Sequence, residues 1–423
     1  MAQQAPISSP AGQSPDAAVH ERDPRLVSDT LVSLGLFGLI ARRLRGGELG
    51  PLPVIIGLVV ICAVFQTLHE RFLSPQNLSN LSVQIVAVGL MTTGVLMVLL
   101  LGEIDLSVGS VAGVSGAVLA VAAVNFALPE WVAILLGALT GLVIGVIHGT
   151  IFAKVGVPAF VVTLAGLIGW QGAQIYILGK DGTINLPYDG AIGYLTQTYF
   201  EPAMGWGFAV VAVAAFAVPS YFGERRRAAA GLPHKSVTEL LVRTALLAVP
   251  VFGAVAVLNQ FKGVPLAFLI FVGFVVAFDL MLRKTRYGRM VFAVGGSAEA
   301  ARRAGINVDL VRISVFALAS TLAALGGIML ASRGFAVSQS TAGGDELMMA
   351  IAAAVIGGTS LFGGRGNAYS ALLGGLVLGA IASGLFLLQM DTSVRFMITA
   401  VVLLIAVILD ALARRSRKTH ARG

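Results

Sequence analysis

The sequence predicts an all-α, polytopic membrane protein with about 10–12 transmembrane segments. Of its 423 residues, 57% are hydrophobic and only 12% are charged, whereas a soluble domain carries roughly 25% charged residues. The apolar residues fall in runs of about 17–23, and helices of this length cross the ~30 Å of hydrocarbon in a bilayer. The alternating segments of about ten residues that are typical of an outer-membrane barrel are absent.

Apolar runs place the candidate segments in order along the chain. They are residues 51–68, 81–101, 104–126, 131–153, 157–178, 203–222, 239–258, 264–282, 311–331, 346–362, 368–389 and 394–412. The runs at 104–126 and 346–362 are rich in Gly, Ser and Ala, so each is a candidate for a broken or re-entrant helix.

The two ends of the chain differ from the apolar region 51–412. Residues 1–25 are rich in Ala, Gln, Ser, Pro and Asp and lack the pattern of a signal peptide, so we expect a disordered cytoplasmic tail. A short apolar run follows and ends in a group of arginines, which predicts an interfacial helix and a basic linker over 26–50. Residues 413–423 form a basic tail.

Basic residues set the expected orientation. With the N-terminus in the cytoplasm and an even number of crossings, the basic clusters at 223–235, 283–312 and 413–423 all fall inside. Both termini are therefore expected to be cytoplasmic. This distribution accounts for the net charge of +8 without a nucleic-acid partner.

The stretch GALTGLVIGVIHG, residues 137–149, predicts a helix-packing face. Glycines four residues apart share one side of a helix and let another backbone approach closely. They are Gly137, Gly141, Gly145 and Gly149. His148 lies in the same stretch without an acidic neighbour in sequence, which favours a packing or hydrogen-bonding role over proton shuttling.

The stretch GEIDLSVGS, residues 102–110, places Glu103 and Asp105 between two apolar runs. Asp105 stands before a helix start and can accept hydrogen bonds from the exposed N–H groups there. Alternatively, Glu103 or Asp105 lies on a translocation path, at a gate, or against a cytoplasmic partner. Acidic residues stand before small residues again at 343–364 with the opposite orientation, a pattern that suggests an inverted repeat.

The stretch GGSAEAARRAGINV, residues 295–308, predicts a two-turn helix in an inner loop. Ser297 suits the N-cap, Glu299 the first turn, and Arg302 the last turn. Gly305 suits the left-handed position after the helix. Such a helix is either interfacial or a docking site for a soluble partner.

This loop resembles the coupling loop of ATP-binding-cassette importer permeases, in which a short EAA sequence is followed by a glycine. Four stretches are similar, in the same order, to the permeases of monosaccharide importers such as the ribose, galactose and xylose systems. They are GEIDLSVGS, VPAFVVTLAG at 157–166, the loop at 283–310 and VIGGTSLFGG at 355–364. The similarity runs from about residue 55 to 412, and the additional segments around 203–258 resemble the longer xylose type.

The resemblance implies a homodimeric permease in the inner (plasma) membrane that translocates a monosaccharide, D-xylose in the xylose type. It implies two ATPase subunits inside, a periplasmic sugar-binding protein outside, and no catalytic residue, metal or cofactor in this chain. By the same analogy the coupling residues are Ser297, Glu299, Ala300, Ala301, Arg302 and Gly305.

A neutral sugar needs only polar and aromatic groups along its path. The polar or aromatic candidates within the segments are Gln84, Thr92, Thr93, Asn125, Thr163, Trp170, Gln171 and Gln174. The path or gate residues that we select from the whole chain are Glu103, Asp105, Gln84, Thr163 and Gln171.

An ion-coupled secondary transporter that uses Glu103 or Asp105 is the alternative function. Nearly all acidic residues fall at predicted segment ends, which disfavours proton coupling. The sequence contains no HExxH, GxSxG or GxxxxGK[ST] motif, so hydrolysis of ATP by a P-loop would require another chain.

Overall fold

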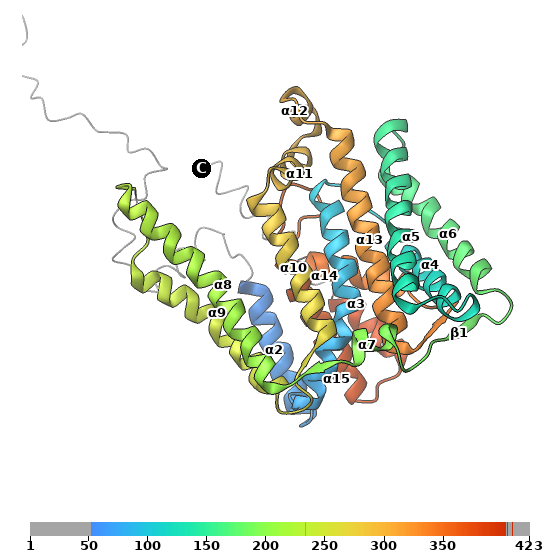
Figure 1. The fold of residues 1–423 in the computed structure, drawn as a ribbon, viewed down its shortest axis with the longest axis horizontal. Helices are drawn as coiled ribbons and strands as arrows, with labels where there is room; N and C mark the ends of the chain where they lie inside the picture. Colours follow the sequence, from blue (N-terminus) through green and yellow to red (C-terminus); the bar gives the residue numbers. More distant parts are fainter. Residues whose placement is uncertain (1–51, 233, 403, 405–407, 409–423) are drawn as a thin grey trace, which may run out of the picture. The chain divides into compact units, whose positions relative to one another are not determined.

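The computed structural model describes residues 52–232, 234–402, 404 and 408, all within the compact unit of residues 50–423. These residues are mostly helical, and nine of their helices are long and apolar enough to cross a membrane (Figure 1). The structure therefore confirms a polytopic all-α membrane protein. The predicted segments 1–25, 26–50 and 413–423 lie outside the described residues, as does most of 403–412.

The nine long helices account for most of the predicted segments. They are α3 (Pro75–Leu100), α4 (Val108–Ala120) continued by the π-helix η2 (Val121–Asn125), α5 (Glu130–Thr150) continued by the π-helix η3 (Ile151–Val155), α6 (Ala159–Leu178), α8 (Pro202–Ala229), α9 (Val237–Leu258), α10 (Leu266–Lys284), α13 (Val308–Gly334) and α15 (Tyr369–Leu387). The shorter helices are α2 (Leu52–Leu68), α7 (Ala191–Gln197), α11 (Arg286–Gly296), α12 (Ala298–Arg303), α14 (Gly344–Ile356) and the apolar helix Thr392–Val402.

The predicted segment 346–362 is a half-length helix. α14 has 13 residues, which at about 1.5 Å per residue cannot cross the hydrocarbon. After it, Gly358, Gly363 and Gly364 have φ values of 99°, 81° and 69°, which end the helix in an irregular loop. The other glycine-rich segment, 104–126, is helical only from Val108 onward.

α3 forms the centre of the bundle, because 89% of its most apolar part is buried. It begins at Pro75, earlier than predicted, because Ser74 accepts a hydrogen bond from the Asn77 N–H at 3.3 Å and starts the helix within a polar stretch. α13 packs on α3 where Gly94 faces the Ala319 carbonyl, 2.6 Å from where a Cβ would lie. A larger residue at Gly94 would push the two helices apart.

The four glycines of α5 face neighbouring helices. A Cβ on Gly141 or Gly145 would meet the α13 carbonyls of Ser320 or Phe316, and a Cβ on Gly149 would lie 2.7 Å from Ile313 Cα of the same helix. The fourth, Gly137, faces the Ser115 carbonyl of α4 at 3.1 Å. These contacts bring α4, α5 and α13 together around the candidate site.

Two short antiparallel pairs of strands tie the loops. β1 (Thr183–Asn185) pairs with β4 (Ala336–Ser338), and β2 (Tyr199–Phe200) pairs with β3 (Val264–Pro265). β1 and β4 join the segment after α6 to the segment after α13. α7 packs near the end of α13 opposite to α12 (Figure 1).

The hairpin of α8 and α9 is peripheral. Only 11% of the most apolar part of each helix is buried. Their exposed apolar side chains therefore suit contact with lipid.

Candidate functional site

Four polar side chains hydrogen bond in series where α4 begins against α5 and α6. Asp105 Oδ1 accepts from the Ser107 N–H at 2.8 Å and from the Ser107 hydroxyl at 2.6 Å. Ser107 Oγ lies 3.4 Å from His148 Nδ1, and the indole N–H of Trp170 donates to His148 Nε2 at 2.9 Å. We call Asp105, Ser107, His148 and Trp170 the Asp105 network.

Local geometry explains how the network forms. Gly102, at φ 79°, turns the chain after α3 so that residues 103–107 run irregularly to the start of α4. Asp105 was expected to accept from N–H groups at the helix start. The N-cap residue is instead Ser107, and Asp105 accepts from Ser107 itself.

The network is inside the protein. Asp105 and His148 are each 3% exposed, and Ser107 is fully buried. A Cβ on Gly166 of α6 would lie 2.6 Å from His148 Cε1, so only glycine leaves room for the imidazole there. Buried polar groups are costly unless they are hydrogen bonded; Asp105 Oδ1 is satisfied by Ser107, whereas Asp105 Oδ2 is buried without a hydrogen-bond partner among the described residues.

Gln174 of α6 contacts both α4 and the segment between α13 and α14. Its amide donates to the carbonyls of Ser338 and Thr341, each at 2.9 Å, and its carbonyl side lies against Gly113 of α4. One turn earlier on α4, a Cβ on Gly109 would meet the Gly343 carbonyl, directly before α14. The start of α4 therefore meets the residue that precedes α14.

The other path candidates have different surroundings. Thr163 is buried on α6, and its hydroxyl lies 3.4 Å from the Ile104 carbonyl and 3.0 Å from the Ala159 carbonyl. Gln84 is half-buried on α3, and Gln171 is exposed on α6. The structure thus brings Thr163 close to the segment that holds Asp105, whereas the side chain of Gln171 faces away from the α6 surface that covers α4.

Glu103 lies near the start of the same segment, shortly after α3 ends. It is half-buried, and this burial raises the pKa of its carboxyl, while the positive charge of Arg312 acts in the opposite direction.

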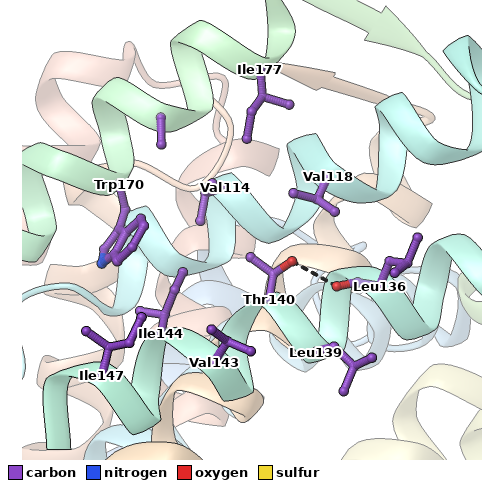
Figure 2. Close-up of a pocket in the computed structure, with 11 residues that line it drawn as sticks. Val114, Val118, Leu136, Leu139, Thr140, Val143, Ile144, Ile147, Trp170 and Ile177 are labelled. Carbon is purple, nitrogen blue, oxygen red and sulfur yellow. Dashed lines mark hydrogen bonds between the residues drawn. The ribbon is translucent and has the colours of Figure 1, made fainter. Parts of the chain in front are cut away.

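An apolar groove runs beside the network between α5 and α6, with α4 as its floor (Figure 2). Its volume is ≈ 390 Å³, and its walls include Val114, Ile144 and Ile177. Trp170 lines one end of the groove. The Thr140 hydroxyl donates a hydrogen bond to the Leu136 carbonyl at 2.8 Å (Figure 2). The groove itself therefore offers little hydrogen bonding to a polar molecule.

The loop 283–310 contains the short helix that the sequence predicts, α12. Ser297 Oγ accepts from the Ala300 N–H at 3.2 Å at the start of α12. Glu299 and Arg303 pair at 3.0 Å on the exposed side, whereas Ala301 is buried. Gly305 has φ 83°, the left-handed conformation expected after the helix.

The matching protein family covers most of this architecture. The family model described as "Branched-chain amino acid transport system / permease component" matches residues 77–407, from the first turn of α3 to beyond α15. The chain belongs to this permease family. It is thus a multi-pass membrane transport protein, and the matched region contains both the Asp105 network and α12.

Curated relatives of this permease carry names of sugar systems. The xylose transport system permease protein XylH of Escherichia coli K12 is 35% identical over 86% of this chain and 92% of its own length. XylH of Haemophilus influenzae is 33% identical over 87% of this chain and 98% of its own length. The ribose import permease protein RbsC of E. coli K12 is 32% identical over 84% of this chain and 92% of its own length. No solved structure matches this chain.

Sequence reasoning missed the proximity of His148 and Asp105. It considered each residue alone, because 41 residues separate Ser107 from His148. The spacing of Gly166 and Trp170, four apart on α6, was the available signal, since it places an open position and an indole donor on one helix face.

Proposed function

We propose that this permease is the membrane subunit of an ATP-binding-cassette importer for a monosaccharide, D-xylose, in the inner membrane. The similarity to the two XylH proteins carries the proposal, because it extends over 86% and 87% of the chain. The similarity to the ribose permease, at 32% identity, supports a monosaccharide as the class of substrate. D-xylose is the more specific part of the proposal.

ATP hydrolysis is assigned to two copies of a partner ATPase that bind the cytoplasmic loop 283–310. Support comes from the shape of α12, a capped two-turn helix with Glu299, Arg302 and Arg303 on its surface. A short rigid helix transmits a displacement better than a flexible loop. The proposed contact residues are Ser297, Glu299, Ala300, Ala301, Arg302 and Gly305.

A sugar-binding protein is assigned to the opposite, periplasmic side. Support comes from α7, which is fixed rather than free. Glu130 Oε2 accepts from the Ile192 N–H at 2.6 Å, and the Ser332 hydroxyl donates to the Ile192 carbonyl at 2.6 Å. A fixed surface loses little conformational entropy when a partner binds.

The proposed active unit is a homodimer, with path residues drawn from Glu103, Asp105, Gln84, Thr163 and Gln171. Carboxylate, amide and hydroxyl groups can all hydrogen bond to sugar hydroxyls.

Reconstitution tests the proposal. Proteoliposomes would contain this chain, its candidate ATPase and its candidate binding protein, and labelled D-xylose uptake would be measured with internal ATP or with only a proton gradient. Uptake that needs ATP and both partners supports the importer. Uptake by this chain alone on a gradient would overturn it in favour of an ion-coupled transporter. Competition by ribose and galactose would rank the sugars.

A further inference from the structure

His148 connects three separate parts of the permease, and the proposed function assigns it no role. The residue belongs to α5, receives a hydrogen bond from Trp170 of α6, and contacts Ser107 at the end of the irregular segment before α4. Both ring nitrogens are engaged, so the imidazole is a junction between the helices.

The donors in the Asp105 network fix the protonation state of His148. An indole nitrogen can only donate, so His148 Nε2 must present its lone pair to Trp170. The Ser107 hydroxyl has one proton, which its 2.6 Å contact assigns to the Asp105 carboxylate. The proton on His148 therefore resides on Nδ1 and faces Ser107 Oγ, and the imidazole is neutral.

A second proton on His148 is incompatible with this arrangement. It would occupy Nε2, where the Trp170 N–H now binds, and two donors would face each other. The imidazolium would still be attracted to Asp105 through Ser107. Protonation therefore detaches Trp170 of α6 while it retains the link to the segment before α4.

Few charged groups surround His148. Among the described residues, Asp105 is the acidic group that Ser107 links to it. α4 and α6 contain no charged residue. Arg312 of α13 lies over Phe152, which is one turn after His148; its guanidinium is 4.5 Å from the centre of the Phe152 ring. The positive charge of Arg312 acts on Glu103. Protonation of His148 is thus opposed by the burial of its imidazole and favoured by the Asp105 carboxylate.

We propose that His148 is a positioning residue: its neutral Nδ1–H form holds Trp170 of α6 to the segment 102–107, and uptake of a proton releases Trp170. On the basis of the proposed function, this contact aligns the segment that carries Glu103 and Asp105 during sugar transport, so transport weakens as the imidazole is protonated.

The first test uses the fluorescence of Trp170 in the purified full-length permease in lipid nanodiscs. The three tryptophans are Trp131, Trp170 and Trp206, so the W131F/W206F variant retains a single reporter. Between about pH 8 and about pH 5, its emission maximum should shift to shorter wavelength as the indole N–H loses its acceptor. Adding H148Q should abolish the shift, because an uncharged amide can accept from Trp170 and donate to Ser107 at every pH.

The second test measures uptake of labelled sugar by the complete reconstituted transporter across the same pH range. H148Q should retain uptake, and it should lose the decrease in uptake that wild type shows as His148 is protonated. H148F, which cannot hydrogen bond, should lose most uptake at every pH. The H69Q variant is the matched control, since His69 lies in a loop outside the network, and its pH profile should follow wild type.

Three outcomes overturn the proposal. They are an emission maximum that does not change with pH, an equal shift in the H148Q variant, and wild-type uptake by H148F. Size-exclusion profiles show whether H148F is folded; if it is not, the comparison between H148Q and wild type decides. The fluorescence test needs neither sugar nor partner subunits, so a failure of the proposed transport function is distinguishable from a failure here.

Discussion

Arg302, in the last turn of α12, lies 3.6 Å from Asp309, in the first turn of α13. The other oxygen of the same carboxylate lies 3.3 Å from Lys154, at the end of α5 in η3. One acidic residue therefore links α12 to two long helices, including the one that carries His148.

Replacing this acidic residue should affect coupling more than stability. All three side chains are partly exposed, and exposed ion pairs contribute about 0.2–1 kcal/mol each. We expect D309N, which weakens both pairs, to lower the free energy of unfolding by about 0.4–2 kcal/mol while it reduces sugar-stimulated ATP hydrolysis by the complex. The E239Q variant, which breaks the Glu239–Arg243 pair on peripheral α9, is the matched control and should leave hydrolysis unchanged.

Altering α12 should uncouple ATP hydrolysis from transport. The R302E/G305P double variant reverses a surface charge and forces proline onto a residue with φ 83°, which proline cannot adopt. We expect normal insertion into the membrane but loss of sugar-stimulated ATPase activity. Normal stimulated turnover in this variant would contradict the proposed docking role.

Enlarging a glycine of α5 should destabilise the bundle. In G141A, the new methyl group would meet the Ser320 carbonyl of α13, and overpacking of this kind costs about 1–3 kcal/mol. Thermal unfolding in detergent should show a lower midpoint. G207A on α8 is the matched control, since nothing lies within 4 Å of that position and the change should be neutral or slightly stabilising.

Removing the Gln174 amide should loosen the segment between α13 and α14 that includes β4. Q174A removes two hydrogen bonds to the carbonyls of the half-buried residues Ser338 and Thr341, and each acceptor left unpaired costs at most about 1–3 kcal/mol. Hydrogen exchange of residues 336–343 should become faster. Q171A, three residues away on the exposed side of α6, should leave this exchange unchanged. Equal rates in Q174A and wild type would show that the pairing of β1 with β4 alone holds this segment.

Local sequence signals predicted much of the fold. Long apolar runs located the spanning helices because membrane crossing demands them, and the Ser297 to Gly305 pattern located α12 because its capping groups lie within nine residues of sequence. The start of α3 was placed too late, since polar residues occupy its first turn.

The site was less predictable because it depends on contacts between distant segments. The Gln174 contacts span 164 and 167 residues, and no periodicity reports such pairs. The π-helices η2 and η3 were also not predicted, since composition does not distinguish a wider helical turn from an α-helical one.

The burial of α3 has a consequence for biogenesis. In the folded protein this helix barely meets lipid, yet its mean hydropathy is unsurpassed among the nine long helices of the described residues. Packing against other helices does not require such hydrophobicity, but release from the translocon does. α3 is synthesised before α13 and α15, so it must first reside in lipid without them. The composition of α3 therefore suits the lipid that surrounds the helix just after its synthesis rather than the protein that surrounds it in the folded state.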